Sequence, residues 1–181
     1  EAAAAAAGNM SDKNILRIVR LFRKLQPDAW YANALGRIEG YVAEGHMGIE
    51  AARRIARNLS PTVRKSIIRN YIVGTLIEGN RVRRKFYEEE GFNAPPMVMM
   101  SPTSVCNYNC YGCYADGEDW KTELPEAVME RVIAEAAAIG SRLIAFTGGE
   151  PFLRKDLMGI LERHREVMFS IYTNGSRITP A

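Results

Sequence analysis

The most constraining feature of this sequence is an alternation of short apolar segments and helical segments in its second half. Residues 97–100, 142–147 and 167–173 are largely apolar runs, which are expected to form strands. Residues 124–139 and 156–165 lie between them and carry apolar residues at helical spacing. This alternation predicts a parallel sheet whose strands are joined by crossover helices. The expected fold class is therefore α/β.

A distinctive short motif follows each of the three expected strands. Functional residues of parallel sheets gather just beyond the carboxyl ends of the strands. Because these ends meet at one edge of the sheet, we expect the three motifs to contribute to one site. In chain order the motifs are Cys106, Cys110 and Cys113, then Gly148-Gly149-Glu150-Pro151, and then Asn174-Gly175.

The three cysteines of the chain have the spacing C-x3-C-x2-C and lie on one expected loop. Structural zinc usually has four protein ligands, disulfides need pairs, and a cubane iron–sulfur cluster normally takes one cysteine for each of its irons. Three thiolates therefore leave one iron free for a ligand that is not protein. Two alternatives stay open. One is a zinc site completed by His164, which is expected to be exposed on a helix. The other is a redox pair of Cys110 and Cys113, which leaves Cys106 unexplained.

With this cysteine spacing and the glycine motif in place, residues 98–175 resemble the radical S-adenosylmethionine (SAM) superfamily. The resemblance implies that Cys106, Cys110 and Cys113 bind a [4Fe–4S] cluster, whose fourth iron binds the amino and carboxylate groups of SAM. It implies that reductive cleavage of SAM yields methionine and a 5′-deoxyadenosyl radical, which abstracts hydrogen from a substrate. It also implies a partial TIM-like (β/α) barrel and an electron donor of the flavodoxin or ferredoxin type.

The resemblance assigns the glycine motif to the methionine end of SAM. Gly148, Gly149 and Glu150 are expected to line the site of the amino group, and Pro151 is expected to shape the turn. This assignment suits the chemistry, because glycines expose backbone at close range and a carboxylate adds negative charge near an ammonium. The alternative is an ordinary strand–helix turn, with Glu150 as a favourable charge at a helix N-terminus.

One position departs from the pattern of the superfamily. In many members the residue before the third cysteine is aromatic and lies by the adenine of SAM, whereas this chain has Gly112. We expect the Gly112 backbone to meet the adenine and a ring from elsewhere to stack on it, with Tyr111 and Tyr114 as candidates. Asn174 resembles an asparagine that faces the active site in many relatives, and we expect it to do the same.

The first half of the chain is expected to form a basic helical domain at 10–93. The core domain is expected at 94–181, and it begins with the helix-breaking residues Ala94-Pro95-Pro96. Glycine and proline positions end the expected helices, although Gly74 and Gly79 can interrupt the last one. The helices are expected to begin near Ser11 and to cover 31–44, 48–59 and a long segment from Ser60-Pro61 to Glu90.

The two halves carry charges of opposite sign. Residues 10–91 hold 16 Lys and Arg against 9 Asp and Glu (16 − 9 = +7), and residues 92–181 hold 8 against 11 (8 − 11 = −3). The basic half is interpreted as the solvated surface of a packed domain, or as a surface for an anionic partner such as nucleic acid or an anionic membrane. No nucleic-acid-binding motif is recognised. The substrate is unknown, with an anionic or membrane-associated one slightly favoured.

Length and composition bound the remaining expectations. Clustered cysteines without partners elsewhere favour a reducing compartment, so we expect a cytoplasmic protein, with peripheral membrane association as the alternative. The alanine-rich residues 1–9 are interpreted as an artificial linker. Three strands do not close a barrel, so residues 94–181 are expected to be the N-terminal part of one. The alternative to an enzyme is a non-catalytic metal-binding or interaction module with structural cysteines.

Overall fold

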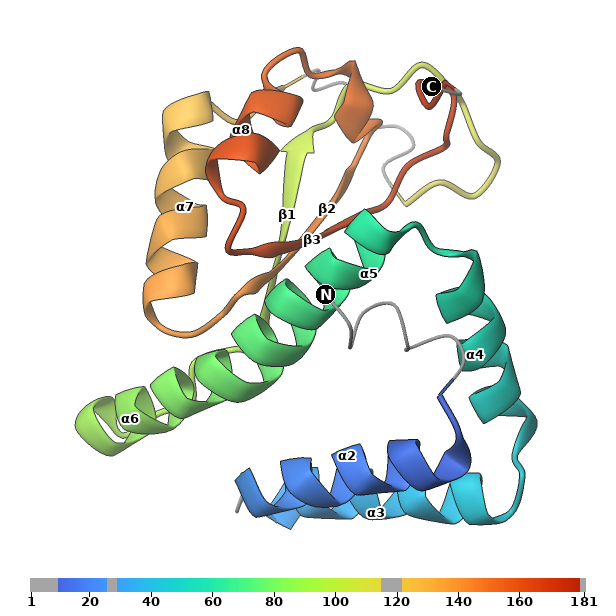
Figure 1. Cartoon of the computed structure of the whole chain (residues 1–181). Helices are drawn as coiled ribbons and strands as arrows, with labels where there is room; N and C mark the ends of the chain where they lie inside the picture. Colours follow the sequence, from blue (N-terminus) through green and yellow to red (C-terminus); the bar gives the residue numbers. More distant parts are fainter. Residues whose placement is uncertain (1–9, 26–28, 115–121, 180–181) are drawn as a thin grey trace. The chain divides into compact units, whose positions relative to one another are not determined.

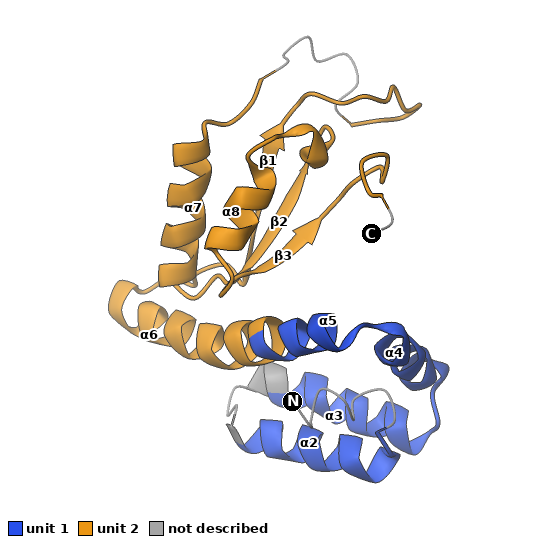
Figure 2. Cartoon of the chain, turned by 45° about the horizontal axis from the view of Figure 1, so that its top comes forward, with its two compact units in different colours: residues 1–69 blue, residues 70–181 orange. Residues whose placement is uncertain are grey.

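The computed structural model describes residues 10–25, 29–114 and 122–179. The expectation for residues 1–9 therefore lies outside the described residues. The chain divides into two compact units, Glu1–Arg69 and Asn70–Ala181 (Figure 2). This division falls inside a helical segment, η2 (Ile67–Gly79), whereas the sequence predicts a domain boundary before residue 94. The predicted domain boundary stays a prediction.

Every element described in the first unit is helical. His46 and Ser60 cap two of the helices, because the His46 Nδ1 accepts a hydrogen bond from the Gly48 N–H and the Ser60 Oγ accepts one from the Val63 N–H. The start of a helix at Ser60-Pro61 was predicted. The helices are α2 (Asp12–Leu25), α3 (Ala29–Ala43), α4 (Met47–Asn58) and α5 (Pro61–Ser66), all within a few residues of the predicted ranges.

Many of the basic side chains in the first unit lie against acidic ones. Arg20 and Arg23 both pair with Glu39, which joins α2 to α3, and Arg57 pairs with Glu50 within α4. Such exposed pairs contribute little to stability. Their acidic partners are already counted in the net charge of +7, so the pairs leave the positive excess of this half unchanged. Among the helices that the structure describes, none has the length and apolar character needed to cross a membrane.

The long helix predicted to follow Pro61 is observed as α5, η2 and α6 (Asn80–Glu90), and it ends at Gly91, which has a φ of 78°. Gly74 and Gly79 were predicted as possible interruptions of this helix. They lie instead within η2, which has the wide hydrogen-bonding pattern of a π-helix. Gly79 is required by packing. A Cβ there would lie 2.7 Å from the Gly140 carbonyl oxygen, which also accepts a 2.6 Å hydrogen bond from Arg83.

The second unit contains the predicted parallel sheet. Its strands are β1 (Met97–Thr103), β2 (Leu143–Gly148) and β3 (Met168–Ile171), in the order β1-β2-β3 with both pairs parallel. The α/β prediction is therefore confirmed. β1 runs further than predicted, through Pro102. A proline is tolerated there because β1 is an edge strand of the described sheet and its pairing is irregular after Met100.

Two helices, α7 (Glu126–Ala138) and α8 (Leu157–Arg163), cover one face of this sheet (Figure 1). Their apolar faces and alternate residues of β2 form the buried core, which fixes the strands in register. Because neighbouring strands are parallel, all three end at the same edge of the sheet. The fully buried members of this core are Met129, Ile133, Ile144, Phe146, Leu157 and Ile160.

Candidate functional site

The three sequence motifs lie at the same edge of the sheet, as predicted (Figure 1). The cysteine segment follows β1, the glycine turn follows β2, and Asn174 follows β3. The glycine turn is also hydrogen-bonded to the residues that lead from β1 into the cysteine motif. The Gly149 N–H donates to the Thr103 carbonyl at 2.8 Å, and the Glu150 N–H donates to the Val105 carbonyl at 2.9 Å.

Gly149 allows this close approach between the glycine turn and the cysteine segment. A Cβ at Gly149 would overlap the Val105 carbonyl group and would lie 2.9 Å from the Ser104 carbonyl carbon. Gly148 has a φ of 101°, which disfavours any residue with a side chain. The Gly-Gly pair was visible in the sequence, but its contact with the cysteine segment was not, because that contact joins two separate strands.

Glu150 is fully buried and accepts hydrogen bonds from neighbouring segments of the chain. Its carboxylate accepts from the Phe152 N–H at 3.0 Å, from the Asn174 N–H at 2.7 Å, and from the Thr173 hydroxyl at 2.8 and 2.9 Å to its two oxygens. The carboxylate thus joins the glycine turn to the end of β3. Its expected contribution to SAM binding stays a prediction, and Thr173 is a partner that the sequence did not reveal.

Glu150→Gln is expected to lower the free energy of unfolding by about 2 kcal/mol, because each carboxylate oxygen accepts a backbone N–H and an amide nitrogen cannot. Urea denaturation monitored by circular dichroism measures this change. Glu162→Gln, on an exposed part of α8, is the matched control and is expected to change stability little. Equal stabilities for the two variants would contradict a structural role for the Glu150 carboxylate.

The three cysteines are free and exposed. The Cys106 Sγ accepts hydrogen bonds from the Tyr108 N–H at 3.5 Å and the Asn174 side chain at 3.9 Å, while the Cys113 N–H donates to the Cys110 carbonyl at 3.1 Å. Within the described ranges, no three His, Cys, Asp or Glu side chains are grouped as metal ligands. The predicted gathering of the thiols around one cluster therefore stays a prediction.

His164 does not match its expected exposure. It ends α8, its side chain is only 13% exposed, and its ring contacts Glu130 and Glu166. The expectation of an exposed histidine was wrong, because the two carboxylates flank the ring. His164 is a poor candidate for the missing zinc ligand because both of its ring nitrogens already face carboxylates.

Asn174 connects the end of β3 to the cysteine segment. Its side-chain amide donates to the Asn107 Oδ1 at 3.0 Å, and its Oδ1 accepts from the Ser176 N–H at 2.9 Å. The Asn107 amide donates in turn to the Ser176 hydroxyl at 2.9 Å. Asn107 was not singled out as a site residue. Its only sequence signal is its place directly after Cys106.

The residues considered for adenine differ in their surroundings. Gly112 has a φ of 74°, and no atom lies within 4 Å of a Cβ built on it, so it provides a turn with open space. Tyr111 is fully exposed. The Tyr114 hydroxyl lies 3.4 Å from the Thr147 hydroxyl of β2, which places this ring beside the glycine turn.

Residues 100–181 match the model of the radical SAM superfamily, and this segment contains all three motifs. This part of the chain belongs to the radical SAM superfamily. The match agrees with the arrangement of the three motifs at one edge of a parallel sheet.

Curated relatives of the radical SAM segment include proteins with different names. It is 37% identical over 85 residues to a probable GTP 3′,8-cyclase of Thermococcus kodakarensis, covering 45% of this chain and 28% of that protein. It is 37% identical over 87 residues to the Fe-coproporphyrin III synthase of Methanosarcina barkeri, covering 46% and 22%. The chain thus spans about a quarter of the length of these relatives. No solved structure matches the chain.

The residues present fit the cofactors that radical SAM proteins bind. Thiolates are the ligands that iron–sulfur clusters prefer, and the radical SAM segment presents three free thiols on one exposed loop. An amide from Asn174 already donates to one of these sulfurs. Because exposed loop thiols are not held together by packing, we expect cluster binding and ordering of this loop to occur together.

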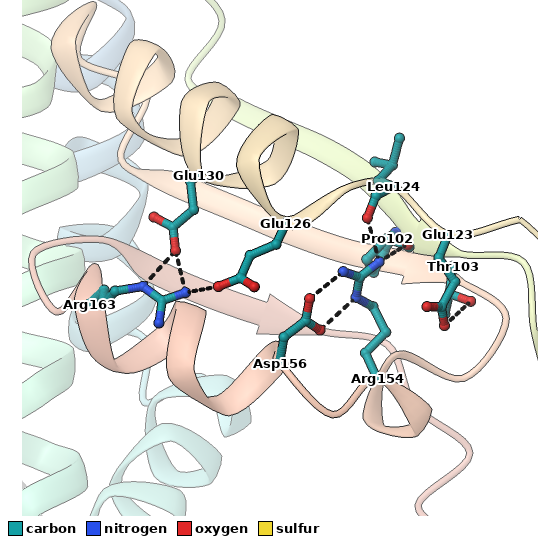
Figure 3. A network of polar contacts seen from close by, with 9 residues as sticks. All are labelled: Pro102, Thr103, Glu123, Leu124, Glu126, Glu130, Arg154, Asp156 and Arg163. Atoms are coloured by element: carbon teal, nitrogen blue, oxygen red, sulfur yellow. Dashed lines mark hydrogen bonds and ion pairs between the residues drawn. The ribbon is translucent and has the colours of Figure 1, made fainter.

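The base of the cysteine loop in the radical SAM segment is held by Arg154 (Figure 3). One nitrogen of its guanidinium, Nη1, donates to the Pro102 carbonyl at 2.8 Å and to the Leu124 carbonyl at 2.7 Å. Its Nε and Nη2 donate to the two carboxylate oxygens of Asp156 at 3.0 and 2.5 Å. The sequence did not identify Arg154, because an arginine in a loop carries no signal of burial.

The ion pair between Asp156 and Arg154 is expected to make stability depend on pH. Hydrogen bonds from Arg154 lower the pKa of Asp156 below its ordinary value of about 3.9. A carboxyl whose pKa is lower in the folded state stabilises the fold above its unfolded pKa, and this contribution is lost as pH falls through the folded pKa. Stability should therefore fall below about pH 4 in the wild type, and Asp156→Asn should show a smaller dependence in urea denaturation at several pH values.

Proposed function

We propose that this chain carries the first part of the catalytic barrel of a radical SAM enzyme that cleaves SAM reductively. The observation that supports this best is the contact between the loop with three free thiols and the glycine turn, at one edge of a parallel sheet. The sheet β1-β2-β3 would be the beginning of that barrel. Further strands would have to complete it, since three strands do not close one.

The site residues have distinct proposed roles. Cys106, Cys110 and Cys113 would hold the [4Fe–4S] cluster, which when bound supplies the electron that breaks a carbon–sulfur bond of SAM to give methionine and a 5′-deoxyadenosyl radical. Gly148 and Gly149 have no side chain to cover their peptide groups, so their backbone can bind the amino group of SAM.

Four more residues shape this site. The Glu150 carboxylate is engaged by protein donors, so it orients the glycine turn and contributes negative potential from inside the fold. Pro151 begins the short helix η3 (Pro151–Leu153), which ends the turn. Tyr114 is favoured over Tyr111 for the adenine because it contacts β2. Asn174 lies beside Cys106 and would donate a hydrogen bond to that sulfur, an interaction that tunes the reduction potential of a cluster.

The substrate is not specified by the residues described. A cyclase that acts on GTP and a synthase of Fe-coproporphyrin III match the chain over segments of similar length. Proteins with different substrates thus share this segment, so its chemistry concerns SAM rather than the substrate. An external electron donor of the flavodoxin or ferredoxin type would reduce the cluster, and a cytoplasmic location would suit such a donor.

The proposed function is tested by forming 5′-deoxyadenosine. The chain is purified without oxygen, reconstituted with iron and sulfide, and incubated with SAM and dithionite. We expect an iron–sulfur absorption band and 5′-deoxyadenosine detected by mass spectrometry. Stoichiometric zinc without an iron–sulfur chromophore would contradict the proposal and would favour a module with structural cysteines.

A further inference from the structure

We propose that Arg154 is a positioning residue that fixes the cysteine loop against the glycine turn, and so sets the placement of the cluster relative to the site for the SAM amino group. This inference rests on the proposed function for its last step. Its structural part, the clamping of the loop by one guanidinium, depends only on contacts within the chain.

The two carbonyls that Arg154 binds belong to the two ends of one loop. Pro102 lies at the end of β1, and Leu124 lies just before α7, so the segment between them contains all three cysteines. Both carbonyls accept from the same nitrogen, Nη1, at 2.8 and 2.7 Å (Figure 3). The guanidinium thus brings the entry and the exit of the loop together at one point.

Backbone pairing continues from this point into the loop. The Leu124 N–H donates to the Pro102 carbonyl at 2.9 Å, the Ser104 N–H to the Thr122 carbonyl at 2.9 Å, and the Thr122 N–H to the Ser104 hydroxyl at 2.8 Å. Thr103 and Glu123 form an isolated antiparallel bridge between them. Arg154 is the only side chain outside this loop for which a bond to its base is described in the residues 10–25, 29–114 and 122–179.

The clamp is built around a buried charge. The Arg154 side chain is only 4% exposed, and two of its three remaining N–H groups, on Nε and Nη2, donate to the two oxygens of Asp156. A bidentate pair of this kind fixes the plane of the guanidinium. A lysine keeps the charge but has a single nitrogen and no planar fork, so it cannot bind the carboxylate and both carbonyls in this geometry.

Arg154 is also tied to the glycine turn. Its N–H donates to the Pro151 carbonyl at 3.1 Å, which closes η3 directly after the turn. The short segment between Gly149 and Arg154 therefore connects the turn rigidly to the clamp. Displacement of the loop base consequently changes how the cysteine loop and the glycine turn face each other.

The test compares Arg154→Lys and Arg154→Met with Arg163→Met. Arg163 is the matched control because it is likewise an arginine bound to carboxylates, those of Glu126 and Glu130 of α7, but it is half exposed and does not contact the loop (Figure 3). Hydrogen exchange of the Ser104, Thr122 and Leu124 amides is measured on each reconstituted protein, together with iron content and the dissociation constant of SAM.

In both Arg154 variants we expect the three base amides to exchange about 10-fold faster, with exchange in α7 unchanged. We expect iron content near that of the wild type, a dissociation constant for SAM raised about 10-fold, and a smaller change in the electron paramagnetic resonance spectrum of the reduced cluster on addition of SAM. Arg163→Met is expected to show none of these effects at the loop.

Several results would overturn the proposal. Unchanged exchange at the base amides would show that Arg154 does not clamp the loop. Faster exchange at the base amides with unchanged SAM affinity would show that Arg154 does not position the cluster. A similar increase in exchange throughout α7 would show that Arg154 stabilises the fold in general. A wild-type protein that binds no cluster would instead contradict the proposed function, while the exchange data would still decide whether the clamp exists.

Discussion

Replacing Cys110 with alanine is expected to lower the formation of 5′-deoxyadenosine by at least about 1,000-fold, equivalent to about 4 kcal/mol. The reason is the ligand count, because a loop with three thiols has none to spare and the chain contains no other cysteine. A cluster with only two cysteine ligands would lose a second iron–protein bond. The measurements are iron and sulfide content, the absorption spectrum after reconstitution, and product formation with SAM and dithionite.

Asn109→Ser is the control for this experiment, since Asn109 is an exposed neighbour of Cys110 in the same loop. It should retain the cluster and nearly full activity. A Cys110→Ala protein that still bound a complete [4Fe–4S] cluster would remove Cys110 from the proposed ligands. Loss of the cluster in both variants would point to sensitivity of the loop in general rather than to the thiol.

Gly149→Ala is expected to be the most damaging substitution outside the cysteines, with a loss of about 3 kcal/mol in stability. A Cβ at this position would overlap the Val105 carbonyl group and crowd Ser104. These contacts are backbone atoms of a segment that is itself paired with the glycine turn, so no side chain can rotate away. The overlap is relieved only if the cysteine loop and the glycine turn move apart. This movement should also weaken the binding of SAM.

Urea denaturation and titration with SAM measure the two effects. Gly40→Ala is the matched control, because nothing lies within 4 Å of a Cβ at Gly40 and its φ suits any residue. That helical substitution is expected to raise stability by about 1 kcal/mol. If Gly149→Ala behaved like Gly40→Ala, the close contact between the two motifs would not be important.

Sequence reasoning identified the second unit well because its signals are local. Apolar runs between turn residues located β1, β2 and β3, and the helical spacing located α7 and α8. The placement of the motifs at one edge followed from the parallel topology. The error at His164 has a non-local cause, because one of its two partners lies on α7. His164 was expected to be exposed among charged neighbours, whereas Glu130 and Glu166 enclose it.

Interactions between segments distant in the chain could not be predicted in the same way. Arg154 is an ordinary polar residue in the sequence, and nothing in its neighbours indicates that it contacts the base of the cysteine loop. Thr173 and Asn107 lie beside or within a motif, but their hydrogen-bond partners in another motif are not visible in the sequence. The buried state of Glu150 is of this kind as well. A charged side chain is normally exposed, and burial of Glu150 is acceptable because it accepts from Phe152 in its own turn and from Thr173 and Asn174 after β3.

The sequence by itself determined the strand–helix alternation, the three-thiol loop and the glycine turn, because each depends on residue type and spacing along a short segment. Tertiary structure decided how these parts are joined. At the edge where the parallel strands end, Gly149 admits the cysteine segment, Glu150 holds β3, and Arg154 closes the loop. Hydrogen bonds between separate strands require three-dimensional proximity, which a linear pattern does not encode.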